Sequence, residues 1–465
     1  MTEKTAEPQP DYRPPAPVPP ATRRSLATKW LKGRHCTISF LAAKSYDSKL
    51  GHVRLPGHDL YTVCEPGLVR RVLVEQWARF PKSDALTRVL KVLIGDAFLI
   101  TNGELWQRQR RMVDPAFASA RLSVAFPLMQ AAVEDMQQRL DGFPDGSIVE
   151  VDVETTRVTA DIIFRTIFSK PVDELGGNEV FAAFNRYQEA ATRYWTLTVS
   201  GLPSFLSLHR FKAAKEARGI RKLLKPLVRD RYEGHRRGEA VETRDILGAL
   251  IQARDPETGA VFGFDELVDQ VAMLFFAGHE TSASALGWAV YLVAACPHIQ
   301  ERIRAETLDV AGDRAPDFGA IKQLKFTRDV FRESLRLYPP VGFIMRQAGH
   351  TECMRDKVIK PESAIAVSPW LIHRHRTYWD RPDVFDPDRF ASEATKTSIR
   401  TAYLPFSLGP RACIGASFAM QEATLILASL ARRYRFEALP DQVPKPIGRL
   451  TIRSANGIKV RIFRR

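Results

Sequence analysis

Apolar side chains recur three and four positions apart over much of the chain, which is the spacing that amphipathic helices show. The pattern is clearest over residues 122–140, 153–168 and 212–232. Pro66 fits the first turn of a further helix, because proline lacks the amide hydrogen that residues deeper in a helix must donate. The helical period dominates up to about residue 380. We therefore predict a mainly α-helical fold.

Two stretches alternate apolar and polar side chains instead, which indicates half-buried β-strands. The first runs from residue 52 to residue 64, with Pro56-Gly57 between its halves, and predicts a hairpin. The second runs from residue 450 to residue 462 around Asn456-Gly457, a pair typical of two-residue hairpin turns. Small β-sheets are therefore expected beside the helices.

One segment is apolar over an unusual length. Residues 265–296 contain no proline, and Pro297 follows directly, where the next helix can begin. At 1.5 Å per residue such a helix would span roughly 48 Å. A membrane span is the alternative, but the run His279-Glu280-Thr281-Ser282 near its middle would be costly in lipid. We predict a long helix through the protein centre with a functional polar interruption.

Length and composition limit the domain organisation. The chain has 465 residues, of which 45% are hydrophobic and 26% charged, as in a soluble globular protein with a large core. Seven prolines fall within residues 1–24, so we expect an extended or disordered tail there. Neither an internal repeat nor a Gly/Ser linker divides the remainder, and residues 25–465 are expected to form one domain.

The charge and the cysteines restrict partners and compartment. A net charge of +15, from 68 Lys and Arg against 53 Asp and Glu, predicts an acidic partner. An acidic electron-transfer protein and an anionic membrane surface both fit, whereas nucleic acid is not expected because no recognition motif accompanies the charge. Five widely spaced cysteines without a CxxC pair favour a reducing compartment. The first residues hold no apolar run, so we expect a cytoplasmic protein without a transmembrane anchor.

The strongest candidate for chemistry is Cys413, in the run Phe406-Ser407-Leu408-Gly409-Pro410-Arg411-Ala412-Cys413-Ile414-Gly415. A helical pattern follows directly, which places the cysteine just before a helix N-terminus. The helix dipole and Arg411 both favour a thiolate there, and a thiolate can bind a metal ion. Gly409 and Gly415 would let the backbone approach a flat cofactor. A lone cysteine is more commonly a buried structural residue, and the ten-residue pattern favours the ligand instead.

This pattern resembles the haem-binding loop of the cytochrome P450 family of haem-thiolate monooxygenases. The matching positions are Phe406, Gly409, Arg411, Cys413 and Gly415. The resemblance implies a single large haem domain, in which Cys413 binds the iron of haem b. It covers nearly all of the chain after residue 24, because three further motifs follow the family's order.

Glu333 and Arg336 belong to the first of these motifs. They lie three residues apart on one predicted helix, where they can pair, although such pairs also decorate many solvated helices. The family completes the pair with an arginine from an aromatic-Pro-x-Arg-Phe segment, here residues 385–390. The resemblance implies that Arg389 joins Glu333 and Arg336 in a buried network that supports the haem loop.

The polar run of the central segment is the second motif, similar to the distal haem face of the family. Ala277 and Gly278 would leave room for dioxygen, while Glu280 and Thr281 would manage protons. A helix cap is the alternative, but a cap does not belong in the middle of an apolar run. His279 has no second histidine four residues away, so we do not expect zinc binding.

The third motif is a Trp-x-x-x-Arg helix. Trp106 and Arg110 lie one turn apart and would meet a haem propionate, the arginine through charge-assisted hydrogen bonds. Without the resemblance they would be a surface aromatic and a solvated charge. Arg346 and Arg411 match two further propionate contacts in the family.

The family resemblance also implies the reaction. Its thiolate pushes electron density onto the haem iron and promotes cleavage of the O–O bond. We expect a monooxygenase that inserts one atom of O2 into an apolar small molecule, by hydroxylation or epoxidation. Electrons would come from NAD(P)H through an acidic ferredoxin or flavodoxin with its reductase, and the protein would be a monomer. Candidates for meeting this partner are Arg108, Arg111, Arg411, Arg432 and Arg433.

Two other functions stay open at this point, namely peroxide-driven oxidation and ligand binding by a non-catalytic haem protein. The Glu280-Thr281 pair favours dioxygen over both. The substrate pocket is expected to include residues 84–100, 181–203, the central segment and residues after Pro340. Its large apolar side chains indicate a lipophilic substrate, such as a fatty acid, terpenoid, steroid or carotenoid; they include Phe98, Leu99, Phe275, Phe343 and Ile344.

Overall fold

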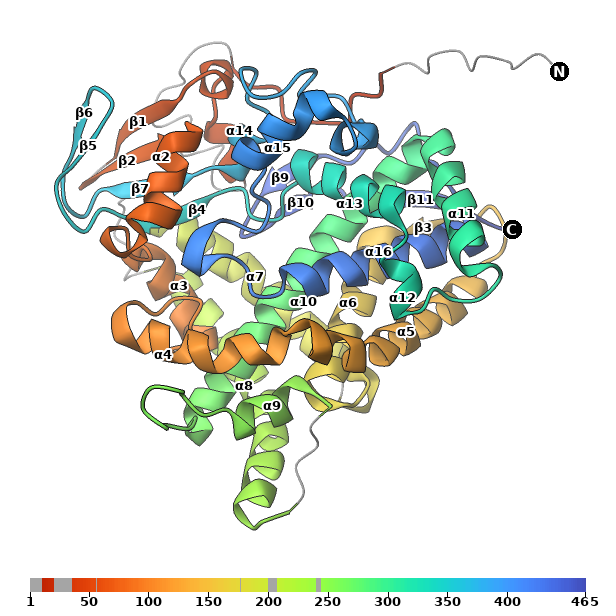
Figure 1. Ribbon diagram of the computed structural model, residues 1–465, viewed down its shortest axis with the longest axis horizontal. Coiled ribbons are helices and arrows are strands. Elements are labelled where there is room, and N and C mark those ends of the chain that lie inside the picture. The colour runs from red at the N-terminus through yellow and green to blue at the C-terminus, as the bar shows by residue number, and fades with distance from the viewer. Residues whose placement is uncertain (1–10, 21–35, 56, 176, 200–206, 240–243) are drawn as a thin grey trace.

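The computed structural model describes residues 11–20, 36–55, 57–175, 177–199, 207–239 and 244–465 (Figure 1). Its regular structure is mainly helical, as the sequence predicts. The helices, in chain order, are α2 Pro66–Arg70, α3 Asp84–Ile94, α4 Gly103–Val113, α5 Ser119–Asp141, α6 Val151–Phe168, α7 Gly177–Val199, α8 Leu208–Arg236, α9 Ile246–Gln252, α10 Phe264–Ala295, α11 Pro297–Ala311, α12 Phe318–Ile321, α13 Lys325–Leu337, α14 Pro369–Ile372, α15 Lys396–Ala402 and α16 Ala416–Arg433.

The strands form small sheets beside the helices. The largest of those described has the order β1-β2-β7-β4 and lies at the upper left of Figure 1. A second sheet has the order β3-β11-β8, and β5 pairs with β6 as β9 does with β10. Their bounds are β1 Leu50–Leu55, β2 His58–Val63, β3 Ile148–Glu150, β4 Ile344–Gln347, β5 Glu352–Met354, β6 Lys357–Ile359, β7 Ala364–Val367, β8 Tyr434–Ala438, β9 Pro446–Gly448, β10 Ile452–Ser454 and β11 Lys459–Arg464.

Most of the elements expected from periodicity are confirmed. The three clearest helical segments lie within α5, α6 and α8, and Pro66 is the first residue of α2. The first predicted hairpin is the antiparallel pair β1-β2, with Leu50 opposite Val63 and Leu55 opposite His58. Pro56 in its turn lies outside the described residues. Local pattern was sufficient here because each element is defined by neighbours in sequence.

The second predicted hairpin is wrong. The chain does turn at Gly457, whose φ is +73°, but the strands on either side do not pair with each other. β10 pairs with β9, whereas β11 pairs with β3 and β8. Alternation identified both strands, yet it holds no information about which other strands offer them hydrogen bonds.

The predicted long central helix is α10. It is unbroken, and the Glu266 carboxylate accepts a hydrogen bond from the Gly263 amide at its start, 3.1 Å away. Most of its side chains are buried, and it runs through the protein centre beside α6 and α16 (Figure 1). By length and apolarity, no helix taken singly in the described ranges qualifies as a membrane span.

Residues 11–20 of the proline-rich tail, for which an extended or disordered chain was expected, contact the protein body. Residues 11–20 run along the protein body without regular structure. The Tyr12 hydroxyl donates to the Tyr291 hydroxyl on α10, and the carbonyl of Pro15 accepts a hydrogen bond from Tyr338, 2.7 Å away. The remaining tail residues, 1–10 and 21–24, lie outside the described part of the chain. Proline content indicated an extended backbone, but contacts with distant residues order it.

Candidate functional site

A cavity of about 1410 Å³ lies between the loop that carries Cys413 and the middle of α10. Its walls are mainly apolar. The predicted site residues in its wall, drawn from four separate stretches of chain, are Trp106, Arg110, Ala277, Gly278, Glu280, Thr281, Arg346, Phe406, Arg411, Cys413 and Gly415. Gly409 is the one predicted site residue that is not in the wall. The fold therefore gathers residues that lie more than three hundred positions apart in sequence.

Hydrogen bonds fold the Cys413 loop into a compact turn before α16. The Cys413 amide donates to the carbonyl of Phe406 at 2.9 Å, and the Ala412 amide donates to the carbonyl of Gly409 at 2.9 Å. Arg110 on α4 donates to the Ala412 carbonyl at 2.9 Å and holds the loop from outside. Cys413 is exposed to the cavity and sheltered from the exterior, so its sulfur can reach a ligand inside.

The two loop glycines serve different purposes. Gly409 has a φ of +73°, and a Cβ on it would overlap the carbonyl oxygen of Leu73. Its role is thus to let the loop pack on the neighbouring chain, which corrects the expectation that it makes room for a cofactor. Gly415 does lie in the cavity wall, and a Cβ there would come no nearer than 4.0 Å, at the sulfur of Cys413, to any described residue other than its chain neighbours.

Burial raises the pKa of the Cys413 thiol, although the Gly415 amide and the Arg110 charge act in the opposite direction. The net direction differs from the expectation that a helix N-terminus and Arg411 suffice to make a thiolate. The nearby charge that matters is that of Arg110, because Arg411 turns toward other partners. A metal ion changes this balance, since a coordinating thiol loses its proton.

Positive charge gathers at one part of the cavity wall. Arg346 and Arg411 are both buried, and burial lowers the pKa of each to about 10. Arg411 donates to the carbonyl of Thr101 and to the Asn102 side chain, both at 3.0 Å, while its Nε has no hydrogen-bond partner among the described residues. Trp106 lies against the Arg411 guanidinium, 4.3 Å from ring centre to Cζ. No carboxylate of the described residues neutralises either arginine.

Lys82 belongs to the same cluster and was missed by sequence reasoning. Its backbone pairs with that of Arg346 as an isolated β-bridge, which brings it into the cavity wall. Burial lowers the pKa of Lys82 well below its usual value, and the charges of Arg346, Arg411 and Arg110 lower it further. No motif surrounds Lys82, so only the tertiary pairing could reveal it.

Two small residues of α10, Gly278 and Thr281, serve different structural purposes. A Cβ on Gly278 would lie 2.6 Å from Cδ1 of Ile163, so this glycine lets α6 approach α10. Its expected role of leaving room in the cavity is therefore secondary to packing. Thr281 also faces the cavity, and its hydroxyl donates to the carbonyl of Ala277 at 2.7 Å, one turn earlier.

Glu280 is held in an ion pair. Arg453 of β10 donates to it from both Nε, at 2.9 Å, and Nη2, and the Thr451 hydroxyl donates at 2.6 Å. Burial raises the pKa of this carboxyl, but the charge and hydrogen bonds of Arg453 outweigh that effect, and the net pKa lies well below its ordinary value. Glu280 is therefore an ionised acceptor, and these contacts count against the expectation that it carries protons. Neither Arg453 nor Thr451 was predicted.

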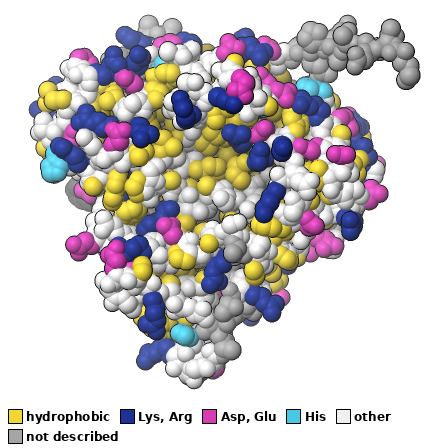
Figure 2. Space-filling view, in the orientation of Figure 1, with side chains coloured by type: hydrophobic (Ala, Val, Ile, Leu, Met, Phe, Trp, Pro, Cys, Tyr) yellow, Lys and Arg dark blue, Asp and Glu magenta, His cyan; other side chains and the backbone are white. Residues whose placement is uncertain are grey.

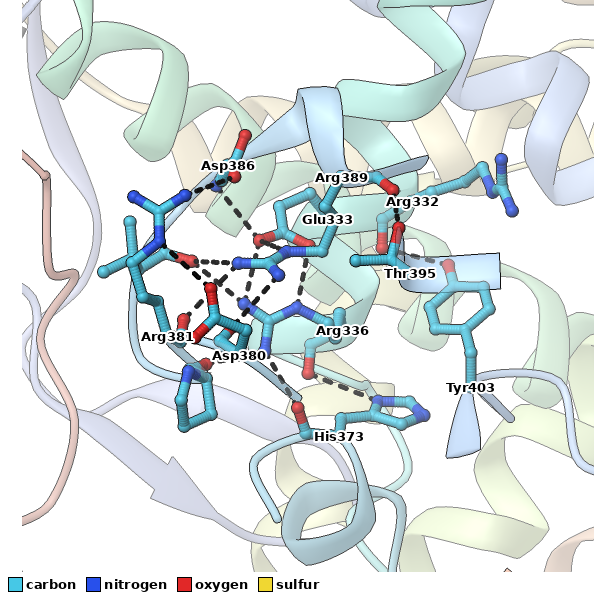
Figure 3. Close-up of polar contacts among 12 residues, drawn as sticks. Arg332, Glu333, Arg336, His373, Asp380, Arg381, Asp386, Arg389, Thr395 and Tyr403 are labelled. Carbon is cyan, nitrogen blue, oxygen red and sulfur yellow. Dashed lines mark hydrogen bonds and ion pairs between the residues drawn. The ribbon is translucent and has the colours of Figure 1, made fainter. Parts of the chain in front are cut away.

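Glu333, Arg336 and Arg389 form the buried network that the resemblance implies (Figure 3). Arg336 Nε lies 2.7 Å from Glu333 Oε2, and Arg389 Nε lies 3.0 Å from Glu333 Oε1. One carboxylate thus serves two guanidinium groups. Their remaining hydrogen atoms are donated to backbone carbonyls, including that of His373 at 2.8 Å, so the network fixes the chain around it.

His373 connects this network to the Cys413 loop. Its Nε2 accepts a hydrogen bond from the Leu404 amide at 2.9 Å, so its Nδ1 must carry the proton and donate to the Arg336 carbonyl, 3.2 Å away. Burial lowers the pKa of His373 to about 3, which keeps the ring neutral. Leu404 in turn accepts from the Ser407 amide at 3.2 Å. The network therefore supports the loop through hydrogen bonds that run along the backbone.

Comparison with known proteins identifies this architecture. A family model described as cytochrome P450 matches residues 29–460. The chain belongs to the cytochrome P450 family. Like other members, this cytochrome P450 is a haem-binding monooxygenase, and its implied ligand is a haem iron.

Relatives from bacteria and plants resemble it along most of their length. Cyclooctatin synthase of Streptomyces melanosporofaciens is 32% identical, over 88% of this chain and 87% of that protein. Cyclooctat-9-en-7-ol 5-monooxygenase of the same organism is 28% identical over 87% and 86%. The solved haem domain of cytochrome P450DA superposes with a TM-score of 0.81 at 24% identity, covering 97% of this chain and 99% of that one, and shows the shared fold.

The cavity of this cytochrome P450 suits a haem group. The buried Arg346 and Arg411 and the half-buried Lys82 pair with no carboxylate of the described residues, and Arg411 Nε has no hydrogen-bond partner among them. They therefore leave a place for an anionic group such as the propionates. The sulfur of Cys413 lies in the same wall, where it could bind a metal ion, and Gly415 beside it adds no side chain. The volume of about 1410 Å³ also exceeds the roughly 300–1,000 Å³ typical of a site for one small molecule. The residues present therefore fit haem with space for a second molecule.

The apolar wall of this cytochrome P450 agrees largely with expectation. Phe98, Leu99, Phe343 and Ile344 line the cavity. Phe275 was wrongly included, because it is fully buried on the other side of α10, against Phe164, Phe184 and His279. Of the segment 181–203, Trp195 lines the cavity, and residues 200–203 lie outside the described chain.

The arginines expected to meet a redox partner are occupied within the molecule. Arg108 pairs with Glu266, Arg111 with Asp255, and Arg433 with Asp141. Arg432 donates to a backbone carbonyl, and Arg411 is buried. On the face shown in Figure 2, basic side chains are scattered among acidic ones and form no single patch. These five arginines therefore do not make a free positive surface.

Proposed function

We propose that this cytochrome P450 hydroxylates or epoxidises a bulky apolar substrate with dioxygen, using electrons from NAD(P)H through separate proteins. The observation that carries the proposal is the apolar cavity that has Cys413 in its wall, unneutralised cations in one part and Thr281 in another. Cys413 would be the iron ligand. Lys82, Arg110, Arg346 and Arg411 would hold the propionates.

When bound, the haem iron supplies reductive activation of dioxygen, which a thiolate ligand favours. Around it, the protein's residues exclude water and handle protons. Ala277 and Thr281 expose little bulk to the cavity, and the Thr281 hydroxyl can turn from the Ala277 carbonyl toward a ligand in the cavity. Glu280, locked by Arg453, would order water through its acceptor oxygens. The apolar wall would bind the substrate because binding removes apolar surface of both the wall and the substrate from water.

The relatives support a lipophilic substrate class. One of them is named for acting on cyclooctat-9-en-7-ol, whose name denotes an unsaturated alcohol. The cavity here has the size to hold such a molecule beside haem. We therefore favour a terpenoid-sized substrate over a short polar one. The net charge of +15 supports an acidic ferredoxin or flavodoxin as the electron donor.

The experiment that tests the proposal compares Cys413→Ala with Cys353→Ala, a matched change at an exposed cysteine on β5. We expect Cys413→Ala to lose the absorption spectrum that carbon monoxide gives with reduced thiolate-bound haem, and to lose turnover completely. Cys353→Ala should keep both. A thiolate-type spectrum in the Cys413 variant would overturn the ligand assignment.

Peroxide-driven oxidation is the second candidate function. Wild-type turnover should require dioxygen, NAD(P)H and a reductase system together. Product formed with peroxide alone, and none with the complete electron-transfer system, would favour the second candidate instead.

A further inference from the structure

The cavity wall carries an excess of positive charge. Among the described residues, one carboxylate belongs to the wall, that of Glu280, beside seven lysine and arginine residues: Lys44, Lys82, Arg110, Arg346, Lys357, Arg411 and Arg449. The proposed function assigns four of these cations to the haem propionates, which leaves Lys44, Lys357 and Arg449. A cleft lined by charge of one sign concentrates ligands of the opposite sign. The wall therefore favours a substrate that carries an anionic group.

The remaining cations differ in whether a carboxylate already pairs with them. Lys357 lies 3.3 Å from the Asp356 carboxylate, which neutralises it. Lys44 and Arg449 are exposed, and within the described ranges neither side chain forms an ion pair or a hydrogen bond. Arg449 is the better candidate for binding an anion, because a guanidinium group offers two parallel N–H donors to one carboxylate.

The turn that carries Arg449 is fixed in the cavity wall. Arg449 lies between β9 and β10, and its amide donates to the Thr451 carbonyl at 2.9 Å. The Ile452 amide donates to the Pro340 carbonyl at 2.9 Å, and the Ile452 carbonyl accepts from the Ser284 hydroxyl of α10 at 2.6 Å. These hydrogen bonds anchor the turn to α10 and to the segment before β4, so the backbone of Arg449 has a defined position at the cavity.

The segment that carries Lys44 packs against the same turn. The amide of Gly448, which precedes Arg449, donates to Cys36 Sγ at 3.4 Å, and a Cβ on Gly448 would overlap Oγ1 of Thr37. Thr37 and Lys44 both line the cavity. The two unpaired cations thus lie on packed segments from opposite ends of the chain, and their exposure places them where the wall meets solvent.

Glu280 does not oppose an anion in this cavity, because its charge is already compensated. The hairpin that carries Arg449 also supplies both partners of Glu280, namely Thr451 at 2.6 Å and Arg453 Nε at 2.9 Å. Arg453 itself is not part of the wall, so the cavity contains seven cations beside a carboxylate that an eighth one neutralises. An uncompensated carboxylate at this position would repel an anionic substrate, and Arg453 removes that repulsion.

We propose that the substrate is an apolar molecule with one carboxylate, which Arg449 binds and Lys44 attracts, an inference that rests on the proposed monooxygenase function. The apolar body occupies the cavity beside Thr281, and the carboxylate pairs with the Arg449 guanidinium on the solvent side. This pairing fixes which end of the substrate points into the cavity. A carboxylate is planar and carries one charge, which suits a single guanidinium, whereas a phosphate monoester carries nearly two.

Pairs of ligands that differ in one charge test this inference. Palmitic, abietic and lithocholic acids are each compared with their methyl esters at about pH 8, where carboxylic acids are ionised. Titration of the holoprotein, followed by the haem absorption spectrum, measures affinity without turnover. We expect at least one acid to bind about 10-fold more tightly than its ester, as one charge-assisted hydrogen bond allows, and added salt to reduce the difference. If no acid binds more tightly than its ester, the inference is wrong.

Substitutions of Arg449 assign the preference to this side chain. Arg449→Gln should bring the affinity for the acid down to that for the ester, and Arg449→Lys should keep part of the difference, because the charge remains while the paired donors are lost. The control is Arg54→Gln, which removes the same charge from an 85% exposed side chain of β1 outside the cavity wall. It should bind both ligands as the wild type does. An Arg449→Gln protein that still prefers the acid would overturn the proposal.

The carbon monoxide spectrum separates this inference from the proposed function. A wild-type protein with the thiolate-type spectrum but without a preference for acids would refute the carboxylate site alone. A wild-type protein without that spectrum would refute the proposed function, whichever ligands it binds.

Discussion

At the scale of single residues, unusual environments gather around the cavity. Arg346 and Arg411 are buried and Lys82 is half-buried, and none of the three has a carboxylate partner among the described residues. The pKa of each is lowered. In the protein alone such charges cost free energy, because burial removes water that nothing replaces. A bound dianion would offset that cost. The cluster is thus arranged for ligand binding at the expense of stability.

Arg346→Leu tests this balance because its two effects have opposite signs. Without haem, we expect the variant to be about 1–3 kcal/mol more stable, since an unpaired buried charge is gone. Haem affinity should fall about 10- to 100-fold, the equivalent of one charge-assisted hydrogen bond. Thermal unfolding of the apoprotein would measure the stability, and haem titration followed by absorbance would measure the haem affinity.

The matched control is Arg54→Leu on β1, where the side chain is 85% exposed. It should change neither quantity appreciably. If Arg346→Leu bound haem as tightly as the wild type, the cationic cluster would not be a propionate site.

At the scale of elements, the Cys413 loop is held in place from outside by contacts with chain segments distant in sequence. Arg110 of α4 fixes its C-terminal half, and the Glu333 network fixes the segment before it through His373 and Leu404. The backbone of Gly409 packs against the carbonyl of Leu73, where no side chain would fit. The loop is rigid because three separate elements constrain it.

Gly409→Ala should show this dependence on packing. The control is Gly312→Ala after α11, where φ is +61° and a Cβ would meet nothing within 4 Å. The control measures how much backbone strain alone lowers the free energy of unfolding, about 1–3 kcal/mol. We expect Gly409→Ala to lower the free energy of unfolding clearly more than the control does. It should also lower the haem content of the purified protein, because the loop must move. Equal losses in thermal unfolding and full haem content in both variants would contradict the packing argument.

At the scale of the whole molecule, segments far apart in sequence meet at α10. The N-terminal residues 11–20 reach it through Tyr12 and Tyr291, and β10 reaches it through Arg453 and Glu280. These contacts join both ends of the chain to the helix that lines the cavity. The N-terminal segment is therefore part of the folded body.

A double-mutant cycle tests the N-terminal contact. In the full-length protein, Tyr338→Phe should cost about 1 kcal/mol, because its hydroxyl donates to the Pro15 carbonyl from a buried position. In a protein lacking residues 1–20 the same substitution should be neutral or stabilising, since the hydroxyl has lost its acceptor. Urea unfolding would measure all four proteins. An equal cost of Tyr338→Phe in both backgrounds would show that Pro15 does not stabilise the fold.

The sequence by itself determined what depends on neighbouring residues. Periodicity located α5, α6, α8 and α10, and the ten-residue pattern located the Cys413 loop. The Glu333 network could also be foreseen, because the resemblance supplied its third member, Arg389. In each case the information lies within one short segment, or in a family pattern that consists of several short sequence motifs.

Only the tertiary structure decided which distant segments meet. It placed Lys82 beside Arg346, paired Arg453 with Glu280 and separated the two C-terminal strands. None of these contacts follows from local pattern, because the residues next to a side chain in sequence do not indicate which distant residues it will contact in the fold. The electrostatic character of the cavity therefore arises from packing, since burial and the distance to other charges fix each protonation state.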